Sequence, residues 1–318
     1  MGFTSTHINN NTTHINKVKP KDKGIQTMLD FSNNTIINDK FKLPSHLDFG
    51  VKYEPTRFNK SKYVINTNTD EVLGIVGDGF TCASHTDFYS GVFDCIGEQF
   101  SEHDVENAVV DFRTARNGAW SMLDISFPTN KKPITTKKHK TEVAQRLIAL
   151  HGVDGSASNK VFTGMIDFFC TNGMVTGDYD KVVRKNTSGF SLDAFMVQLN
   201  KSQRDFQAQA DLIQGWANTE FNTFQSNGVK DLLDDIVTSQ SKSEKLYDLY
   251  MEESATRGHN KFALYSAFTN YASYADKRNG FALRSNGNDT QAVSMWQRES
   301  EVAKLVTNKK FLQYAVAA

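Results

Sequence analysis

The chain has 318 residues, and its 36 basic side chains (Lys and Arg) balance its 36 acidic ones (Asp and Glu). This length can bury one large core or two moderate ones. Zero net charge excludes a protein that attracts nucleic acid over its whole surface, but not one with a local basic patch. No apolar run is long enough to cross a bilayer. Three cysteines without a CxxC spacing are typical of a reducing compartment, so we expect a cytoplasmic protein with no membrane partner.

The first hundred residues are predicted to contain an arm, a hairpin and a helix. Residues 1–24 carry four lysines and little that could be buried, which indicates a flexible basic arm. Residues 25–60 are expected to be an irregular lead-in. The β-branched runs at 63–66 and 72–76 flank the turn residues Asn68-Thr69-Asp70, which predicts a hairpin. From Ser84, a residue suited to an N-cap, apolar side chains recur at helical spacing as far as Ile96.

A second hairpin is predicted around Asn117-Gly118, the strongest short-range turn signal in the chain. Residues 107–114 alternate before it, and Trp120 begins the return strand. Residues 143–151 and 161–170 are apolar runs that fit buried strands or short helices. Between Thr129 and Arg146 lie six basic side chains, opposed by Glu142 alone. Because this basic segment contains Pro133, we expect it to be an exposed loop.

From residue 192 onward the pattern becomes helical. An amphipathic stripe is formed by Leu192, Phe195, Met196, Leu199, Phe206, Ile213 and Trp216. Further helices are predicted over 228–238, 242–254, 258–276 and 288–306. The predicted fold class is therefore α+β: an antiparallel hairpin sheet with packed helices over 25–190, followed by a helical C-terminal region over 191–318 that packs on the sheet domain.

Two turn-rich clusters bracket an apolar stretch near the middle of the chain. They read His151-Gly-Val-Asp154-Gly155-Ser156 and Cys170-Thr171-Asn172-Gly173. The segment resembles a phage/plasmid-like family catalogued as a domain of unknown function, in which "HDGS" precedes a short strand and "CTN" or "CQN". The similarity covers roughly residues 45–315. The chain departs from the family pattern where Gly152-Val153 separates His151 from Asp154. The resemblance implies a phage or plasmid context in a bacterial host and names no activity.

Local charge and aromatic residues give the leading hypothesis for function. Single-stranded nucleic acid is typically held by a basic groove that tracks the phosphates and by aromatic rings that stack on bases. The candidate nucleic-acid-binding residues are Lys131, Lys132, Lys137, Lys138, Lys140, Arg184, Lys185, Arg57 and Tyr63. We therefore predict a non-enzymatic phage or plasmid DNA-metabolism protein that binds single-stranded DNA and promotes annealing or recombination. Hairpins followed by a helix resemble the core of single-strand annealing proteins, a fold-level analogy that also implies homo-oligomers.

Three alternatives stay open beside this hypothesis. The charged segments are also typical of an ordinary solvated surface. Residues 231–254 carry seven acidic side chains against two lysines, which suits an accessory factor that binds host or phage proteins, replication proteins among them. A metal-dependent hydrolase or nuclease would need clustered Asp and Glu side chains, and the sequence has no such cluster.

The remaining polar motifs favour structure over catalysis. Cys170 and His151 could form a thiol and its base, but free cysteines are usually buried and inert. His85-Thr86-Asp87 lies at a helix start, where capping explains it. We therefore expect no cofactor, no metal and no enzyme activity. The turn motifs are Asp154, Gly155, Ser156, Asn172 and Gly173. If both turns lie at one end of the sheet, their N–H groups could form an anion nest beside Lys181, Arg184 and Lys185.

Overall fold

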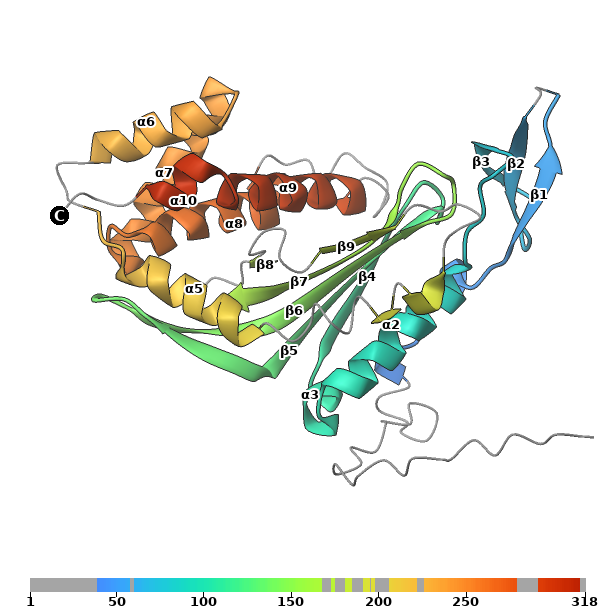
Figure 1. Ribbon diagram of the computed structural model, residues 1–318, viewed down its shortest axis with the longest axis horizontal. Coiled ribbons are helices and arrows are strands. Elements are labelled where there is room, and N and C mark those ends of the chain that lie inside the picture. The colour runs from blue at the N-terminus through green and yellow to red at the C-terminus, as the bar shows by residue number, and fades with distance from the viewer. Residues whose placement is uncertain are drawn as a thin grey trace, which may run out of the picture.

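A computed structural model describes residues 39–57, 60–167, 173–174, 181–184, 191–194, 196–197, 206–221, 226–278 and 291–314. The fold is α+β, as predicted: two antiparallel sheets are followed by helices (Figure 1). The predicted basic arm, residues 1–24, lies outside the described residues. In the part of the chain that the structure describes, no helix is long and apolar enough to span a membrane.

The small sheet has the strand order β1-β2-β3, and the large sheet has the order β4-β5-β6-β7-β8, with β9 also paired to β7. The strands of the small sheet are β1 (Val51–Pro55), β2 (Ser61–Asn66) and β3 (Val72–Gly77). Those of the large sheet are β4 (Val109–Ala115), β5 (Trp120–Thr135), β6 (Lys140–Gly152), β7 (Asn159–Asp167), β8 (Gly173–Met174) and β9 (Lys181–Arg184).

The turn between β4 and β5 confirms the hairpin predicted at Asn117-Gly118. Arg116, Asn117 and Gly118 all have left-handed backbones, with φ values of 54°, 53° and 80°. Asn and Gly tolerate this region well, which is why the pair is a strong turn signal. β5 then runs back beside β4 and continues for 16 residues, so that β5 and β6 form a long hairpin of their own.

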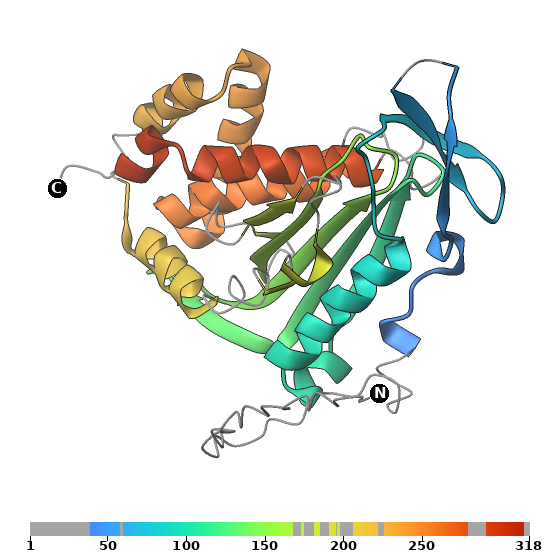
Figure 2. The ribbon, with the colours of Figure 1, turned by 45° about the vertical axis from the view of Figure 1, so that its right-hand side comes forward.

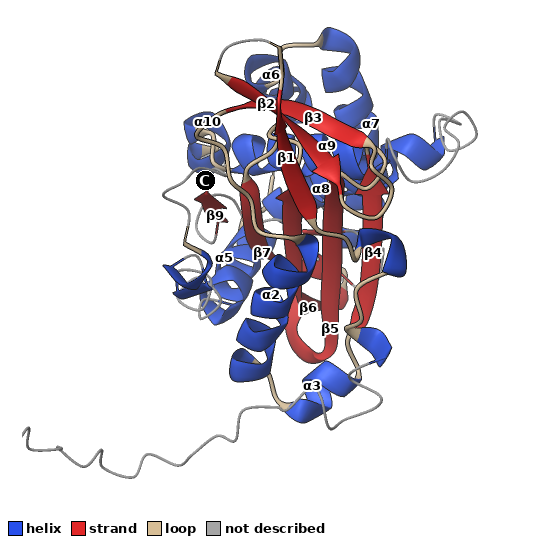
Figure 3. Cartoon of the chain, turned by 90° about the vertical axis from the view of Figure 1, so that its right-hand side faces the viewer, coloured by secondary structure: helices blue, strands red, loops and turns tan. Residues whose placement is uncertain are grey.

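Helix α2 (His85–Gln99) covers one face of the large sheet (Figure 3). The Ser84 hydroxyl accepts a hydrogen bond from the Asp87 N–H, which confirms the predicted N-cap. The apolar side of α2 packs on alternate residues of β5 and β6, among them Leu123, Ile125 and Leu147. The short helix α3 (Glu102–Glu106), which the sequence analysis missed, then leads into β4.

The C-terminal helices pack on the large sheet beyond α2, where Ile134, Val143 and Met165 join their apolar core (Figure 2). They are α5 (Phe206–Asn218), α6 (Ser226–Ile236), α7 (Gln240–Arg257), α8 (Lys261–Arg278), α9 (Gln291–Val306) and α10 (Lys309–Gln313). Four of them match the helices predicted after residue 228, whereas α10 was not predicted. Of the predicted stripe, Phe206, Ile213 and Trp216 are buried in α5, and Phe195 and Leu199 lie outside the described residues. Trp216 packs on Tyr265 and Phe311, which joins α5 to α8 and α10.

Two ion-pair networks join the sheet to these helices. Arg146 of β6 donates to Asp124 of β5 at 2.6 Å and to Glu299 of α9 at 3.0 Å. Arg257, at the end of α7, donates to Asp167 at the end of β7 at 2.7 Å. Both arginines are buried. Asp124 and Asp167 belong to the predicted sheet region, 25–190, and Glu299 belongs to the predicted helical region, 191–318. Buried ion pairs therefore join the two regions across the predicted boundary near residue 190.

Candidate functional site

The basic segment predicted as a loop is the end of the β5–β6 hairpin, so that prediction was wrong. β5 continues through Pro133 to Thr135, and β6 begins at Lys140. The segment is a strand because Ile134 and Val143 point inward and are almost fully buried. Four residues, 136–139, make the turn. There the Thr136 N–H donates to the His139 carbonyl at 2.7 Å, and the Thr136 hydroxyl accepts from the His139 N–H at 3.0 Å.

The five lysines of this segment lie in and beside the turn between β5 and β6. We call this set the hairpin tip, which comprises Lys131, Lys132, Lys137, Lys138 and Lys140. Lys131 forms an ion pair with Glu142 across the two strands, and Lys137 forms one with Glu220 beyond α5. The other three lysines have no ion pair with any described residue. Arg146, which the sequence analysis counted in the same segment, is buried between Asp124 and Glu299 and takes no part in the tip.

The other predicted nucleic-acid-binding residues lie at the opposite end of the large sheet or outside the described residues. Arg57 follows β1 and is exposed, and Tyr63 lies in β2, partly exposed. Arg184 of β9 pairs with Asn159, the first residue of β7, which lies near the end of β6. Lys185 is outside the described residues. The hairpin tip and the Tyr63 region are therefore separate surfaces.

The Asp154-Gly155-Ser156 turn lies at the end of the large sheet opposite the hairpin tip, and its polar side chains are hydrogen-bonded to one another and to neighbouring residues. The Asp154 carboxylate accepts from the Ser156 N–H at 2.9 Å, the Trp120 indole at 3.2 Å and the Arg116 guanidinium at 3.0 Å. The Ser156 hydroxyl donates to the same carboxylate at 2.6 Å. Asp154 thus joins the β4–β5 turn to the β6–β7 turn. This structural role explains the Asp154-Gly155-Ser156 motif.

The small sheet docks on this same turn. A Cβ atom at Gly74 of β3 would lie 2.7 Å from the Asp154 carbonyl oxygen, so only glycine allows the approach. Gly155 has a φ of +79°, and a Cβ there would lie 2.5 Å from Val76. Two glycines on facing elements therefore set how closely β3 meets the turn.

The condition for a shared anion nest, that both turns lie at one end of the sheet, is not met. Gly173 of β8 pairs with Ile166, near the end of β7, whereas the Asp154 turn precedes the start of β7 at Asn159. The two turns therefore lie toward opposite ends of that strand. In addition, the Ser156 N–H is already occupied by the Asp154 carboxylate. Asn172 lies outside the described residues.

A buried polar cluster that the sequence analysis missed joins α2 to the sheet. His85 Nε2 lies 2.8 Å from the Gly118 carbonyl oxygen, so it carries a proton and donates. His85 Nδ1 is then an acceptor and lies 2.8 Å from both Ser121 Oγ and His151 Nδ1. The Tyr89 hydroxyl donates to Ser121 Oγ at 2.9 Å. The sequence predicted a capping role for His85, but Ser84 is the cap and His85 is buried in the core.

Burial makes this cluster structural. Its four members, His85, Tyr89, Ser121 and His151, have no exposed surface. Burial lowers the pKa of His85 to about 4 and also lowers the pKa of His151, so both imidazoles are neutral at pH 7. A hydroxyl and an imidazole without solvent access cannot meet a substrate. No local pattern links two histidines that are 66 residues apart, and Cys170, the thiol considered beside His151, lies outside the described residues.

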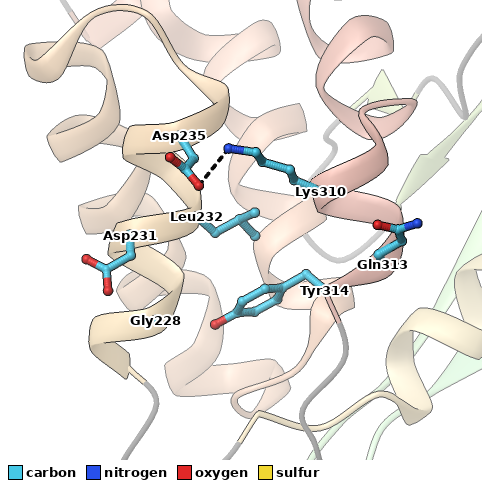
Figure 4. Close-up of a pocket in the computed structure, with 7 residues that line it drawn as sticks. All are labelled: Gly228, Asp231, Leu232, Asp235, Lys310, Gln313 and Tyr314. Carbon is cyan, nitrogen blue, oxygen red and sulfur yellow. Dashed lines mark ion pairs between the residues drawn. The ribbon is translucent and has the colours of Figure 1, made fainter.

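The acidic segment 231–254 forms parts of α6 and α7, and it borders an open groove of about 490 Å³ between α6 and α10 (Figure 4). Leu232 and Tyr314 give the groove an apolar floor, and Asp231 lies at its edge. Asp235 forms an ion pair with Lys310 at 2.8 Å across it. Burial, and then the nearby Asp231, raises the pKa of Tyr314.

Comparisons with known proteins add no relative: no family model, no curated protein and no solved structure matches this chain. Among the described residues, no group of three or more His, Cys, Asp or Glu side chains is placed to hold a metal ion.

Proposed function

We propose that this protein binds single-stranded DNA through the hairpin tip. The observation that carries the proposal is the placement of five lysines around one hairpin end: two near the end of β5, two in the turn and one at the start of β6. Three of them have no ion pair among the described residues. A rigid hairpin holds these charges at fixed spacing, and each phosphate that a lysine neutralises releases a condensed counterion.

The two paired lysines remain available to a phosphate. Lys131 and Glu142 are each about half exposed, and the Lys137 side chain is 80% exposed. Exposed ion pairs are worth only about 0–1 kcal/mol. A phosphate can therefore replace Glu142 or Glu220 as the partner of Lys131 or Lys137 with little loss.

Two further considerations support a role in DNA metabolism. The segment around Asp154 resembles a phage/plasmid-like family, and replication and recombination are common roles in that context. A hairpin sheet covered by a helix is also the arrangement expected of single-strand annealing proteins, an analogy at the level of fold. On this proposal the protein is non-enzymatic, promotes strand annealing, forms homo-oligomers and works beside host or phage replication proteins in the bacterial cytoplasm.

The proposal is tested by removing charge at the tip and, separately, at a distant surface. The variant Lys132→Gln/Lys138→Gln/Lys140→Gln should weaken binding of a fluorescent single-stranded oligonucleotide by about tenfold or more at low salt. The control Lys245→Gln/Lys304→Gln/Lys309→Gln removes the same charge from α7, α9 and α10. Equal losses in the two variants would show a non-specific charge effect and would refute the assignment to the tip.

The second candidate function is that of an accessory factor that binds a host or phage protein. The groove between α6 and α10 favours it, because an apolar floor flanked by carboxylates suits a partner with basic and apolar side chains. Association that persists at high salt, together with no retention on DNA, would support this function over the first.

A further inference from the structure

The two edges of the small sheet are built differently. β1 carries Lys52, Glu54 and Pro55, which are residues that block unwanted strand pairing. β3 reads Val-Leu-Gly-Ile-Val-Gly and has no charge and no proline. Val72 is 55% exposed and Ile75 is 58% exposed, and they are among the most exposed large apolar side chains of the described residues. One edge is protected and the other is open.

The open edge is held rigidly. β3 is hydrogen-bonded to β2 on one side, and among the described residues no strand pairs with its other side. Its inner face rests on the Asp154 turn through the close approach of Gly74. The small sheet projects from the body of the protein (Figures 1 and 3), and Val72 and Ile75 of β3 are exposed. A partner would meet a preformed strand edge and would not have to order it.

Acidic side chains stand at both ends of this edge. Glu71 precedes the strand and Asp78 follows it, and both are exposed and have no ion pair among the described residues. Asp70, by contrast, is paired with Lys52. We propose that β3 is a docking edge for an extended apolar peptide segment with lysine or arginine at its ends, which adds a strand to the small sheet.

A second copy of this chain fits the edge poorly. If two β3 strands paired antiparallel about the middle of the strand, the register would place Glu71 of each copy opposite Asp78 of the other. Like charges directly opposite one another destabilise a strand pair. The charge pattern therefore favours a basic partner over self-association at this edge.

Peptide binding by the full chain tests the proposal. The probe is a fluorescein-labelled peptide of alternating valine and threonine with two lysines at each end, and the matched probe has glutamates in place of the lysines. The native chain should bind the lysine peptide at least about fivefold more tightly than the glutamate peptide. The reason is that the contacts at Glu71 and Asp78 are attractive with the first peptide and repulsive with the second. The variant Glu71→Lys/Asp78→Lys should reverse this preference.

Variants at the two edges separate β3 from other surfaces. Val72→Lys/Ile75→Lys places charge on the open edge and should lower affinity for the lysine peptide by about tenfold or more. Glu54→Lys makes a similar change on β1, where Glu54 and Ile75 stand on either side of Tyr63, and should leave binding within about twofold. Both variants should keep the thermal transition of the native chain and its binding to single-stranded DNA, because the hairpin tip lies at the other end of the large sheet.

Three results would overturn the proposal. One is equal binding of the lysine and glutamate peptides, and another is unchanged binding by a folded Val72→Lys/Ile75→Lys variant. The third is a dimer of the native chain, seen by sedimentation, that Val72→Lys/Ile75→Lys dissolves, since a second copy would then occupy the edge. Loss of DNA binding in the hairpin-tip variant bears on the proposed function alone and leaves this edge untouched.

Discussion

At the residue scale, Asp154 joins the β4–β5 and β6–β7 turns at the end of the large sheet opposite the hairpin tip. Its carboxylate accepts hydrogen bonds from Arg116, Trp120 and Ser156, and its side chain is almost fully buried. A buried acceptor that is lost leaves its donors unsatisfied, at a cost of about 1–3 kcal/mol. The motif therefore has a structural explanation that requires no catalysis.

We predict that Asp154→Asn lowers the free energy of unfolding by about 2 kcal/mol, because its NH2 group replaces one of the two acceptor oxygens and faces a donor, either Arg116 or the Ser156 and Trp120 pair. Arg116→Gln is the control, and it should cost less than about 1 kcal/mol because the Arg116 side chain is 51% exposed. Urea denaturation measures both values. If the two variants lost equal stability, the ion pair between Arg116 and Asp154 alone would hold the two turns together, and the hydrogen bonds from Trp120 and Ser156 would contribute little.

The paired histidines predict a loss of stability in acid. In the unfolded chain each imidazole gains a proton near pH 6.5, whereas burial lowers the pKa of His85 to about 4 and also lowers that of His151. The unfolded state thus binds more protons between these values. The contribution of the two histidines should be constant above pH 7 and fall as the pH drops toward 4, by about 3 kcal/mol for His85 alone.

Denaturation midpoints from pH 7.5 down to pH 4.5 check this prediction. His151→Leu removes one of the two buried titrating groups, so its decline should be shallower than that of the native chain. A native profile that stays flat through this range, or a variant profile that is steeper, would contradict neutral burial of the pair.

At the scale of elements, the strands and helices with local signals were predicted well. Asn117-Gly118 fixes its hairpin because both residues tolerate a positive φ, and Ser84 fixes the start of α2. The segment around Lys132 was misassigned, because its lysines and Pro133 resemble a loop. Only the packing of Ile134 and Val143, which depends on distant helices, makes it a strand. β1 was missed for a similar reason, since its alternation is short and half exposed.

The docking of the small sheet on the Asp154 turn predicts unequal effects of alanine at two glycines. Gly155→Ala should lower the free energy of unfolding by about 2 kcal/mol, because of the positive φ and the contact with Val76. Gly79→Ala, in the turn after β3, meets no atom within 4 Å and has no positive φ, so it should be nearly neutral. Thermal melts compare the two, and equal effects would show that β3 does not rest on the turn.

At the scale of the whole molecule, buried ion pairs join the sheet to the C-terminal helices, so we expect the two to unfold as one cooperative unit. Arg146 is buried between Asp124 and Glu299, and Arg257 is buried beside Asp167. The sequence could not predict these networks, because their partners are up to 153 residues apart. It did predict that the helical region packs on the sheet, since each has an apolar face that must be covered.

We predict that Arg146→Leu lowers the free energy of unfolding by about 3–5 kcal/mol, because two carboxylates then stay buried without their cation. Arg146→Leu/Glu299→Leu should recover part of that loss. Far-UV circular dichroism and tryptophan fluorescence should report a single coincident transition in the native chain. Two separate transitions would contradict the account of one cooperative unit.

The most direct test of the proposed function is a salt series with the native chain. Fluorescence anisotropy would follow labelled single- and double-stranded oligonucleotides of equal length. We expect tighter binding of the single strand, with log K falling linearly against log salt at a slope of about −2 to −4, as three to five lysines of the tip require. No binding of the single strand at low salt, or a slope near zero, would contradict the proposal and direct attention to protein partners.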